Sequence, residues 1–172
     1  KDLEGGESLV NIFFFSTDEE LLTKNTQPAL VALEWSLAQM WQSKGVSPTM
    51  VLGHNVGEIA AACVAGAMTI ETALEMAVER ARLVRQLPHN NGTMVALRCS
   101  LEEANTTMSS CLSEEDQHLC GVASVNGPNS IVLSGARDIV EKVLAALGKR
   151  GVYLRVSHAF HSPLMRGMED EF

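Results

Sequence analysis

The sequence has no apolar run long enough to cross a membrane, no Cys-x-x-Cys pair and no excess of positive charge. Its longest apolar stretch, residues 59–68, is about half the length that a spanning helix needs. The formal net charge is -8, which argues against a nucleic-acid partner. The four cysteines lack metal-ligand spacing, so we expect reduced thiols in a cytoplasmic protein.

The two ends of the chain also lack familiar signals. No charged and apolar leader follows Lys1, so we do not expect secretion. The 172 residues suffice for one good core or parts of two small ones. The hydrophobic content of 46% and charged content of 20% are ordinary for a globular protein.

The most informative stretch is residues 50–65, MVLGHNVGEIAAACVA. A short apolar run at 50–52 predicts a strand, and a helix of small residues follows a Gly-x-x-x-Gly corner from Gly53 to Gly57. Strand, sharp turn and helix form the layout of a nucleophile elbow, in which Gly-x-Ser-x-Gly holds a serine at positive φ. Here the tip residue is Asn55, which tolerates positive φ but is no acyl-accepting nucleophile.

Periodicity and end signals predict the elements around this elbow. Apolar spacing predicts helices over 27–41 and about 70–86, the second capped by Thr69. The composition changes at 88–92, PHNNG, which is the best candidate for a boundary between two parts of the chain. The later segments predict a strand at 93–98, a helix at 100–112, two strands at 121–125 and 130–134, a helix at 136–147 and a strand at 152–156. The segment Asn-Gly-Pro-Asn at 126–129 predicts a hairpin turn between the two middle strands. This β-α-β-β-α-β order is that of the split ferredoxin-like unit.

Several motifs in order resemble one family. Residues 53–58, Gly-His-Asn-Val-Gly-Glu, are similar to the Gly-His-Ser-x-Gly-Glu of the acyltransferase domain of polyketide and fatty acid synthases, the malonyl-CoA:acyl carrier protein transacylase family. The other matching segments are TQPAL at 26–30, ALE at 32–34, AACVAG at 61–66, VNGP at 125–128 and HAFHSPLM at 158–165. Family domains begin with a Gly-Gln-Gly strand that is absent here, so we expect an interior piece of a larger domain.

The resemblance implies an α/β fold of two parts. An incomplete hydrolase-like α/β subdomain at 1–88 carries an inserted ferredoxin-like subdomain at 89–157, and 158–172 returns to the larger part, with the working cleft between them. Residues 9–15 could be a buried strand by composition, but the resemblance favours short helices there. Thr17 with Glu20 forms a plausible capping box for 18–22.

The family reaction is ping-pong acyl transfer. The resemblance implies that malonyl passes from coenzyme A to the residue at position 55, and then to the phosphopantetheine thiol of an acyl carrier protein. It assigns His161 as the base, the Val56 amide as an oxyanion donor and Arg80 as a bidentate clamp for the substrate carboxylate. It implies no bound cofactor, with malonyl-CoA, the carrier protein and neighbouring synthase domains as partners.

Two further residues have both a functional and a structural interpretation. Phe160 in His-Ala-Phe-His is typical of malonyl-using members, because a phenyl ring fills the space of an α-methyl group, yet it could be simple core. His54 belongs to the family motif, but a packing role under the turn is at least as plausible. Without a motif, His161 and Arg80 would be an ordinary loop histidine and a solvated arginine. His158 and His161 have no further ligand spacing for a metal.

Asn55 leaves three interpretations open. The chain is a serine-to-asparagine variant of an active enzyme, a decayed domain that still binds acyl-CoA or carrier protein, or an enzyme with another nucleophile. Cys63 and Ser162 are the candidates for the last, and neither lies at the tip. We therefore predict an acyltransferase impaired by Asn55, with a non-catalytic binding or scaffold domain as the alternative. A hydrolase is disfavoured because Arg80 selects acids and no acidic triad partner is evident.

Overall fold

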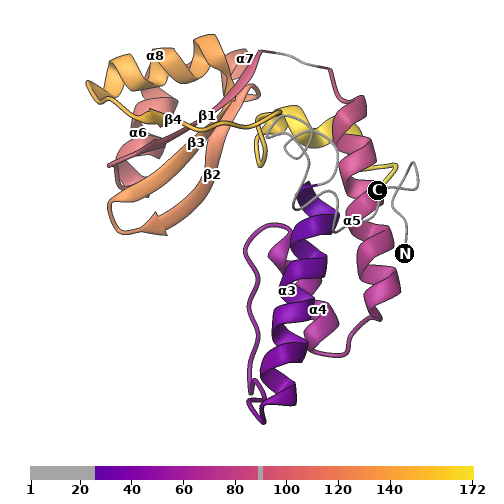
Figure 1. Cartoon of the computed structure of the whole chain (residues 1–172). Coiled ribbons are helices and arrows are strands. Elements are labelled where there is room, and N and C mark those ends of the chain that lie inside the picture. Colours follow the sequence, from indigo (N-terminus) through magenta and orange to yellow (C-terminus); the bar gives the residue numbers. More distant parts are fainter. Residues whose placement is uncertain (1–25, 89–90) are drawn as a thin grey trace. The chain divides into compact units, whose positions relative to one another are not determined.

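The computed structural model describes residues 26–88 and 91–172, which contain both helices and a sheet and confirm the α/β class (Figure 1). The chain divides into two compact units, Lys1–Gln86 with Phe172 and Leu87–Glu171. The elements predicted at 9–15 and 18–22 lie outside the described residues.

Three helices make up the described part of the first unit. They are α3 (Thr26–Ser43), α4 (Gly57–Val64) and α5 (Ile70–Gln86), and they pack against one another (Figure 1). All three were predicted, and α5 begins after the predicted cap, where Thr69 Oγ1 accepts the Thr72 N–H at 3.2 Å. Their shared core consists of small and branched side chains: Val31, Val56, Ile59, Cys63, Ala73 and Ala77.

The apolar stripe that predicts α3 is not the face that α3 buries. Leu33, Leu37 and Trp41 are 43%, 45% and 55% exposed, whereas Ala29 and Val31 on the same helix are buried. Helical spacing therefore identified the element but not the side by which it packs within this unit.

The prediction of a strand at residues 50–52 is wrong. The segment joins no sheet, and Met50 and Leu52 are 89% and 92% exposed. A strand is defined by pairing with a neighbour, and all four strands of the described chain belong to the second unit. Within the described residues, the apolar run at 50–52 therefore forms no backbone hydrogen-bond ladder with another strand.

The second unit is built on one antiparallel sheet with the strand order β2-β3-β1-β4. Its elements are β1 (Gly92–Leu97), α6 (Leu101–Cys111), α7 (Glu114–Gln117), β2 (Cys120–Gly127), β3 (Ser130–Ala136), α8 (Arg137–Leu147), β4 (Val152–Tyr153) and the 3-10 helix η2 (Pro163–Met168). Each predicted strand and helix is present, although β4 is shorter than 152–156. The short helices α7 and η2 were not predicted.

Local end signals explain why these boundaries fall where they do. Ser100 Oγ accepts the Glu103 N–H at 3.1 Å at the start of α6. Gly148 closes α8 with φ of 62°, a left-handed value that glycine adopts without strain. β2 and β3 pair as a hairpin whose turn residues are Pro128 and Asn129, while the predicted turn residues Asn126 and Gly127 still belong to β2.

The C-terminal segment packs with the second unit, since η2 contacts both β2 and β3. Residues 158–171 are thereby grouped with 87–157, whereas the family resemblance sets 158–172 apart as a return to the larger part. The bounds 1–88, 89–157 and 158–172 stay a prediction.

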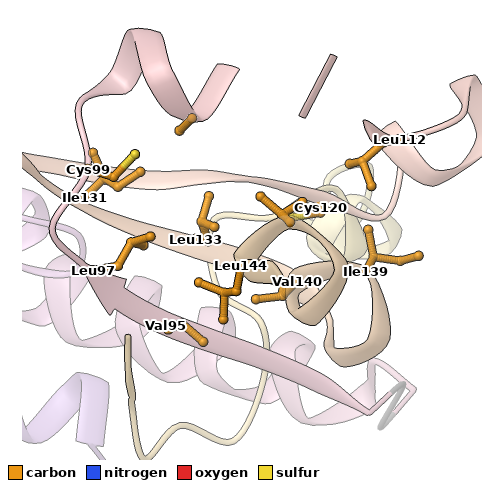
Figure 2. Close-up of a cluster of buried hydrophobic side chains, with 12 residues drawn as sticks. Val95, Leu97, Cys99, Leu112, Cys120, Ile131, Leu133, Ile139, Val140 and Leu144 are labelled. Carbon is orange, nitrogen blue, oxygen red and sulfur yellow. The ribbon is translucent and has the colours of Figure 1, made fainter. Parts of the chain in front are cut away.

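The core of the second unit lies between the sheet and the helices α6 and α8 (Figure 2). Leu133 is fully buried in β3. We expect Leu133→Ala to lower the free energy of unfolding by about 3 kcal/mol, because it removes buried methyl groups and leaves a cavity. Urea unfolding followed by circular dichroism measures this loss. The matched variant Leu101→Ala, at a leucine that is 42% exposed, should lower the free energy of unfolding by less than about 1 kcal/mol. Equal losses in the two variants would contradict the assignment of Leu133 to the core.

Candidate active site

The corner before α4 has the geometry of an elbow. Asn55 is exposed at its tip with φ of 56°, as the sequence predicts. The turn is closed by two backbone hydrogen bonds, from Gly57 N–H to His54 O at 3.0 Å and from Glu58 N–H to Asn55 O at 3.2 Å. The side chain at position 55 is consequently presented at a fixed point ahead of α4.

Only one of the two elbow glycines is required by close approach. A Cβ on Gly53 would lie 2.1 Å from the backbone nitrogen of Glu58, whereas a Cβ on Gly57 would meet nothing nearer than Glu34 Oε2 at 3.6 Å. Gly53 N–H also donates to Glu58 Oε1 at 3.3 Å. The incoming segment and the start of α4 can therefore pass each other only with glycine at position 53.

Arg80 reaches the tip from α5. Its Nη2 donates to Asn55 Oδ1 at 3.0 Å, and its Nη1 donates to Gln27 Oε1 at 2.5 Å. Burial lowers the pKa of the Arg80 guanidinium from its ordinary value, although an arginine keeps its charge in proteins. The structure thus places a half-buried cation directly against the tip residue.

Gln27 is the site residue that sequence reasoning missed. It lies 53 residues before Arg80, so no local spacing connects the two. The segment TQPAL at 26–30 carried a signal as a motif but gave no role to the glutamine. In the structure the Gln27 side chain fixes one nitrogen of the guanidinium, which orients the group.

The Val56 N–H stands at the start of α4. Val56 is buried and is the residue that precedes the helix. Within the described residues its N–H has no hydrogen-bond partner. Such N–H groups at a helix N-terminus attract negative charge, which is the property that the expected oxyanion donor needs.

In the second unit a tight turn presents His161. His161 is exposed with φ of 58°. The next residue, Ser162, is buried and holds the turn: its Oγ donates to Ala159 O at 2.6 Å and accepts the Leu164 N–H at 3.2 Å. His161, like Asn55, therefore occupies a left-handed position that its surroundings impose.

The ring of Phe160 lies edge-on to that of His158, with centroids 6.3 Å apart and planes at 69°. His158 is buried, and its Nδ1 lies 3.1 Å from Ser157 Oγ. Phe160 is only half-buried, so part of the ring remains available to a ligand.

His54 faces a different feature from Asn55 and Arg80. It is exposed and borders a pocket of about 570 Å³ between α3, α4 and residues 46–54. Trp41, Met50 and Leu52 supply much of the apolar lining. Asn55 and Arg80 are not among the lining residues, so this pocket and the Asn55–Arg80 pair are separate features of the first unit.

Two kinds of feature are absent from residues 26–88 and 91–172. No group of three or more His, Cys, Asp and Glu side chains there is arranged to hold a metal ion. No helix in that part is long and apolar enough to cross a membrane.

Residues 10–172 match the model of a protein family described as the acyl transferase domain. The chain is 41% identical over 174 residues to polyketide synthase GfsA of Streptomyces halstedii, an alignment that covers 98% of the chain and 2% of that synthase. It is 46% identical over 160 residues to mycoketide-CoA synthase of Mycobacterium tuberculosis, which covers 90% and 4%.

Solved structures agree in fold. The acyltransferase domain from the second module of the salinomycin polyketide synthase superposes with a TM-score of 0.87 at 42% identity, covering 96% of this chain and 39% of that one. A malonyl-transacylase solved in complex with a type II polyketide synthase acyl-carrier protein gives a TM-score of 0.87 at 27% identity, covering 96% and 55%. The chain thus spans a small part of the curated synthases and about half or less of these solved chains.

Proposed function

The chain belongs to the acyl transferase domain family, and on that premise we propose that it serves the transfer of a malonyl-type acyl group from coenzyme A to an acyl carrier protein in polyketide or fatty acid synthesis. One observation carries the proposal: Arg80 Nη2 lies 3.0 Å from the side chain at the elbow tip. A fixed guanidinium beside the acyl-accepting position is what recognition of an acid substrate requires.

The proposed chemistry assigns one role to each site residue. With serine at position 55, the hydroxyl attacks the thioester carbonyl while His161 takes its proton, and the Val56 N–H stabilises the oxyanion. The coenzyme A thiolate leaves and is protonated by His161. The thiol of the carrier's phosphopantetheine then attacks the acyl-serine by the same steps in reverse. No metal or bound cofactor enters this sequence, and neighbouring synthase domains would supply the carrier.

With Asn55 at the tip, the proposed reaction stops at its first step. A carboxamide has no hydroxyl to deprotonate, so we propose that the chain forms no acyl-enzyme. The retained contact between Asn55 and Arg80 favours a second candidate function, a non-catalytic domain that binds acyl-CoA or carrier protein within a synthase. The two candidates share the same acid-binding site and differ in whether turnover occurs.

The finer description of the fold is part of the proposal. The antiparallel order β2-β3-β1-β4, with α6 and α8 packed on the sheet, supports a ferredoxin-like unit. The elbow with its glycine corner supports a hydrolase-like origin for the first unit. The four free cysteines suit a reducing, cytoplasmic compartment.

Phe160 and His54 keep secondary roles. The half-exposed ring of Phe160 supports a part in acyl selectivity, where one methyl group is worth about 1–3 kcal/mol. His54 is proposed to support the site next to the tip.

Arg80→Ala tests the proposed substrate class. We expect the affinity for malonyl-CoA to fall about 10- to 100-fold, because a charged hydrogen-bond donor to the carboxylate is lost. Isothermal titration measures this change. The matched control is Arg82→Ala on the same helix, where the guanidinium pairs with Glu79 at 2.5 Å. This variant should bind malonyl-CoA as the unmodified chain does. Equal affinity in the Arg80→Ala variant and the unmodified chain would refute the proposed role.

A further inference from the structure

We propose that the Asn55 carboxamide competes with the substrate carboxylate for Arg80, so that the residue at the tip weakens recognition of acids in addition to removing the nucleophile. This inference rests on the proposed function, because it concerns the same arginine. It adds a specificity role for Asn55 that does not follow from the loss of a hydroxyl group alone.

The hydrogen bonds of the guanidinium are the starting point. Each terminal nitrogen of Arg80 already donates to a neutral amide oxygen, Nη1 to Gln27 and Nη2 to Asn55. A carboxylate bound in the bidentate mode needs two parallel N–H groups. The amide oxygen of an asparagine stands one bond farther from Cβ than the hydroxyl of a serine, so asparagine extends farther toward Arg80 than serine can.

Of the two amide oxygens, that of Asn55 is the one a ligand can displace. Gln27 is half-buried, and its hydrogen bond to Arg80 is partly shielded from solvent. Asn55 is exposed, and its oxygen lies at 3.0 Å. A carboxylate accepts a stronger hydrogen bond from a guanidinium than a neutral amide does, so it can replace Asn55, but it loses the free energy of the bond that it breaks.

Asn55 is held ready for this contact by the corner itself. Its positive φ and the hydrogen bonds that close the turn fix the backbone and the direction of the Cα–Cβ bond. The competitor therefore loses no backbone freedom when it binds Arg80, only that of its side-chain torsions. Neutral acyl thioesters make no use of Arg80, so the competition reduces the preference for malonyl-CoA over acetyl-CoA.

Two substitutions at the tip separate this proposal from a simple loss of function. Asn55→Gly suits the positive φ and removes the carboxamide, so the affinity for malonyl-CoA should rise about tenfold, or about 1.4 kcal/mol. Asn55→Asp places a carboxylate on Arg80 and should reduce that affinity below that of the unmodified chain. Acetyl-CoA binding should be the same in all three, as measured by isothermal titration.

Two control variants test whether the gain in affinity acts through Arg80. Adding Arg80→Ala to Asn55→Gly should abolish the gain in malonyl-CoA affinity. Asn105→Ala, at an exposed asparagine of α6 in the second unit, should change neither ligand's affinity. The inference is overturned if Asn55→Gly binds malonyl-CoA no more tightly than the unmodified chain while Arg80→Ala still loses it; the proposed function survives that result.

If no variant binds malonyl-CoA, the proposed function fails, and a ligand-free measurement decides the inference. The rotation of the Arg80 guanidinium, followed by nitrogen-15 NMR, should be slower in the unmodified chain than in Asn55→Gly, because the hydrogen bond to Asn55 restrains it. Equal rates would show that Asn55 does not hold Arg80 and would overturn the inference.

Discussion

Replacing Asn55 with serine is expected to turn a chain that takes no acyl group from malonyl-CoA into one that does. The loss of a nucleophile costs on the order of 10⁶-fold in rate in a well-studied serine enzyme, so the unmodified chain should show no gain in intact mass. Labelling of Asn55→Ser should appear as the added mass of one malonyl group.

The site of labelling distinguishes the interpretations of Asn55. A malonyl group on residue 55 of the serine variant, lost when His161→Ala is added, is the expected result. A mass gain on the unmodified chain, mapped to Cys63 or Ser162, would revive an alternative nucleophile. Both are buried, burial raises the pKa of the Cys63 thiol, and the Ser162 hydroxyl is already engaged in its turn, so neither is suited to attack.

Gly53→Ala is expected to lower the free energy of unfolding of the first unit by about 3 kcal/mol or more. The added Cβ would overlap the backbone nitrogen of Glu58 at 2.1 Å, and backbone cannot move aside as a flexible side chain can. Urea unfolding followed by tryptophan fluorescence isolates this unit, because both tryptophans of the chain, Trp35 and Trp41, lie in α3.

Gly57→Ala is the matched control within the same corner. Its new Cβ would make only an ordinary contact with the Glu34 carboxylate, and alanine is a better helix residue than glycine. We expect a change within about 1 kcal/mol of zero. A loss as large as that of Gly53→Ala would contradict the geometry of the corner.

Most elements could be predicted from the sequence because their end signals are local. Thr69, Ser100 and Gly148 mark helix ends through hydrogen bonds or φ values that depend on near neighbours. The helix α7 had a comparable signal, since Ser113 Oγ accepts the Asp116 N–H at 3.2 Å, but four residues are too few for periodicity. The strand at 50–52 failed because pairing is not a local property.

Less of the candidate site than of the fold could be predicted from the sequence. The glycine corner and the positive φ at Asn55 were anticipated from the motif, whereas Arg80 was named through the family resemblance and as a contact of the substrate only. The hydrogen bond from Arg80 to Gln27 was not anticipated, because it joins α5 to the start of α3 across 53 residues. The roles of His161, Phe160, His54 and the Val56 amide remain predictions.

The claim that positions 55 and 161 serve one reaction is central, and cross-linking tests it most directly. Asn55→Cys and His161→Cys would be introduced together in a chain whose four native cysteines are replaced, and treated with a short bifunctional thiol reagent. We predict efficient cross-linking of this pair and none in a chain that carries only one of the two introduced cysteines. A folded chain in which positions 55 and 161 fail to cross-link would contradict the claim, since a base must come within hydrogen-bond reach of the group that it deprotonates.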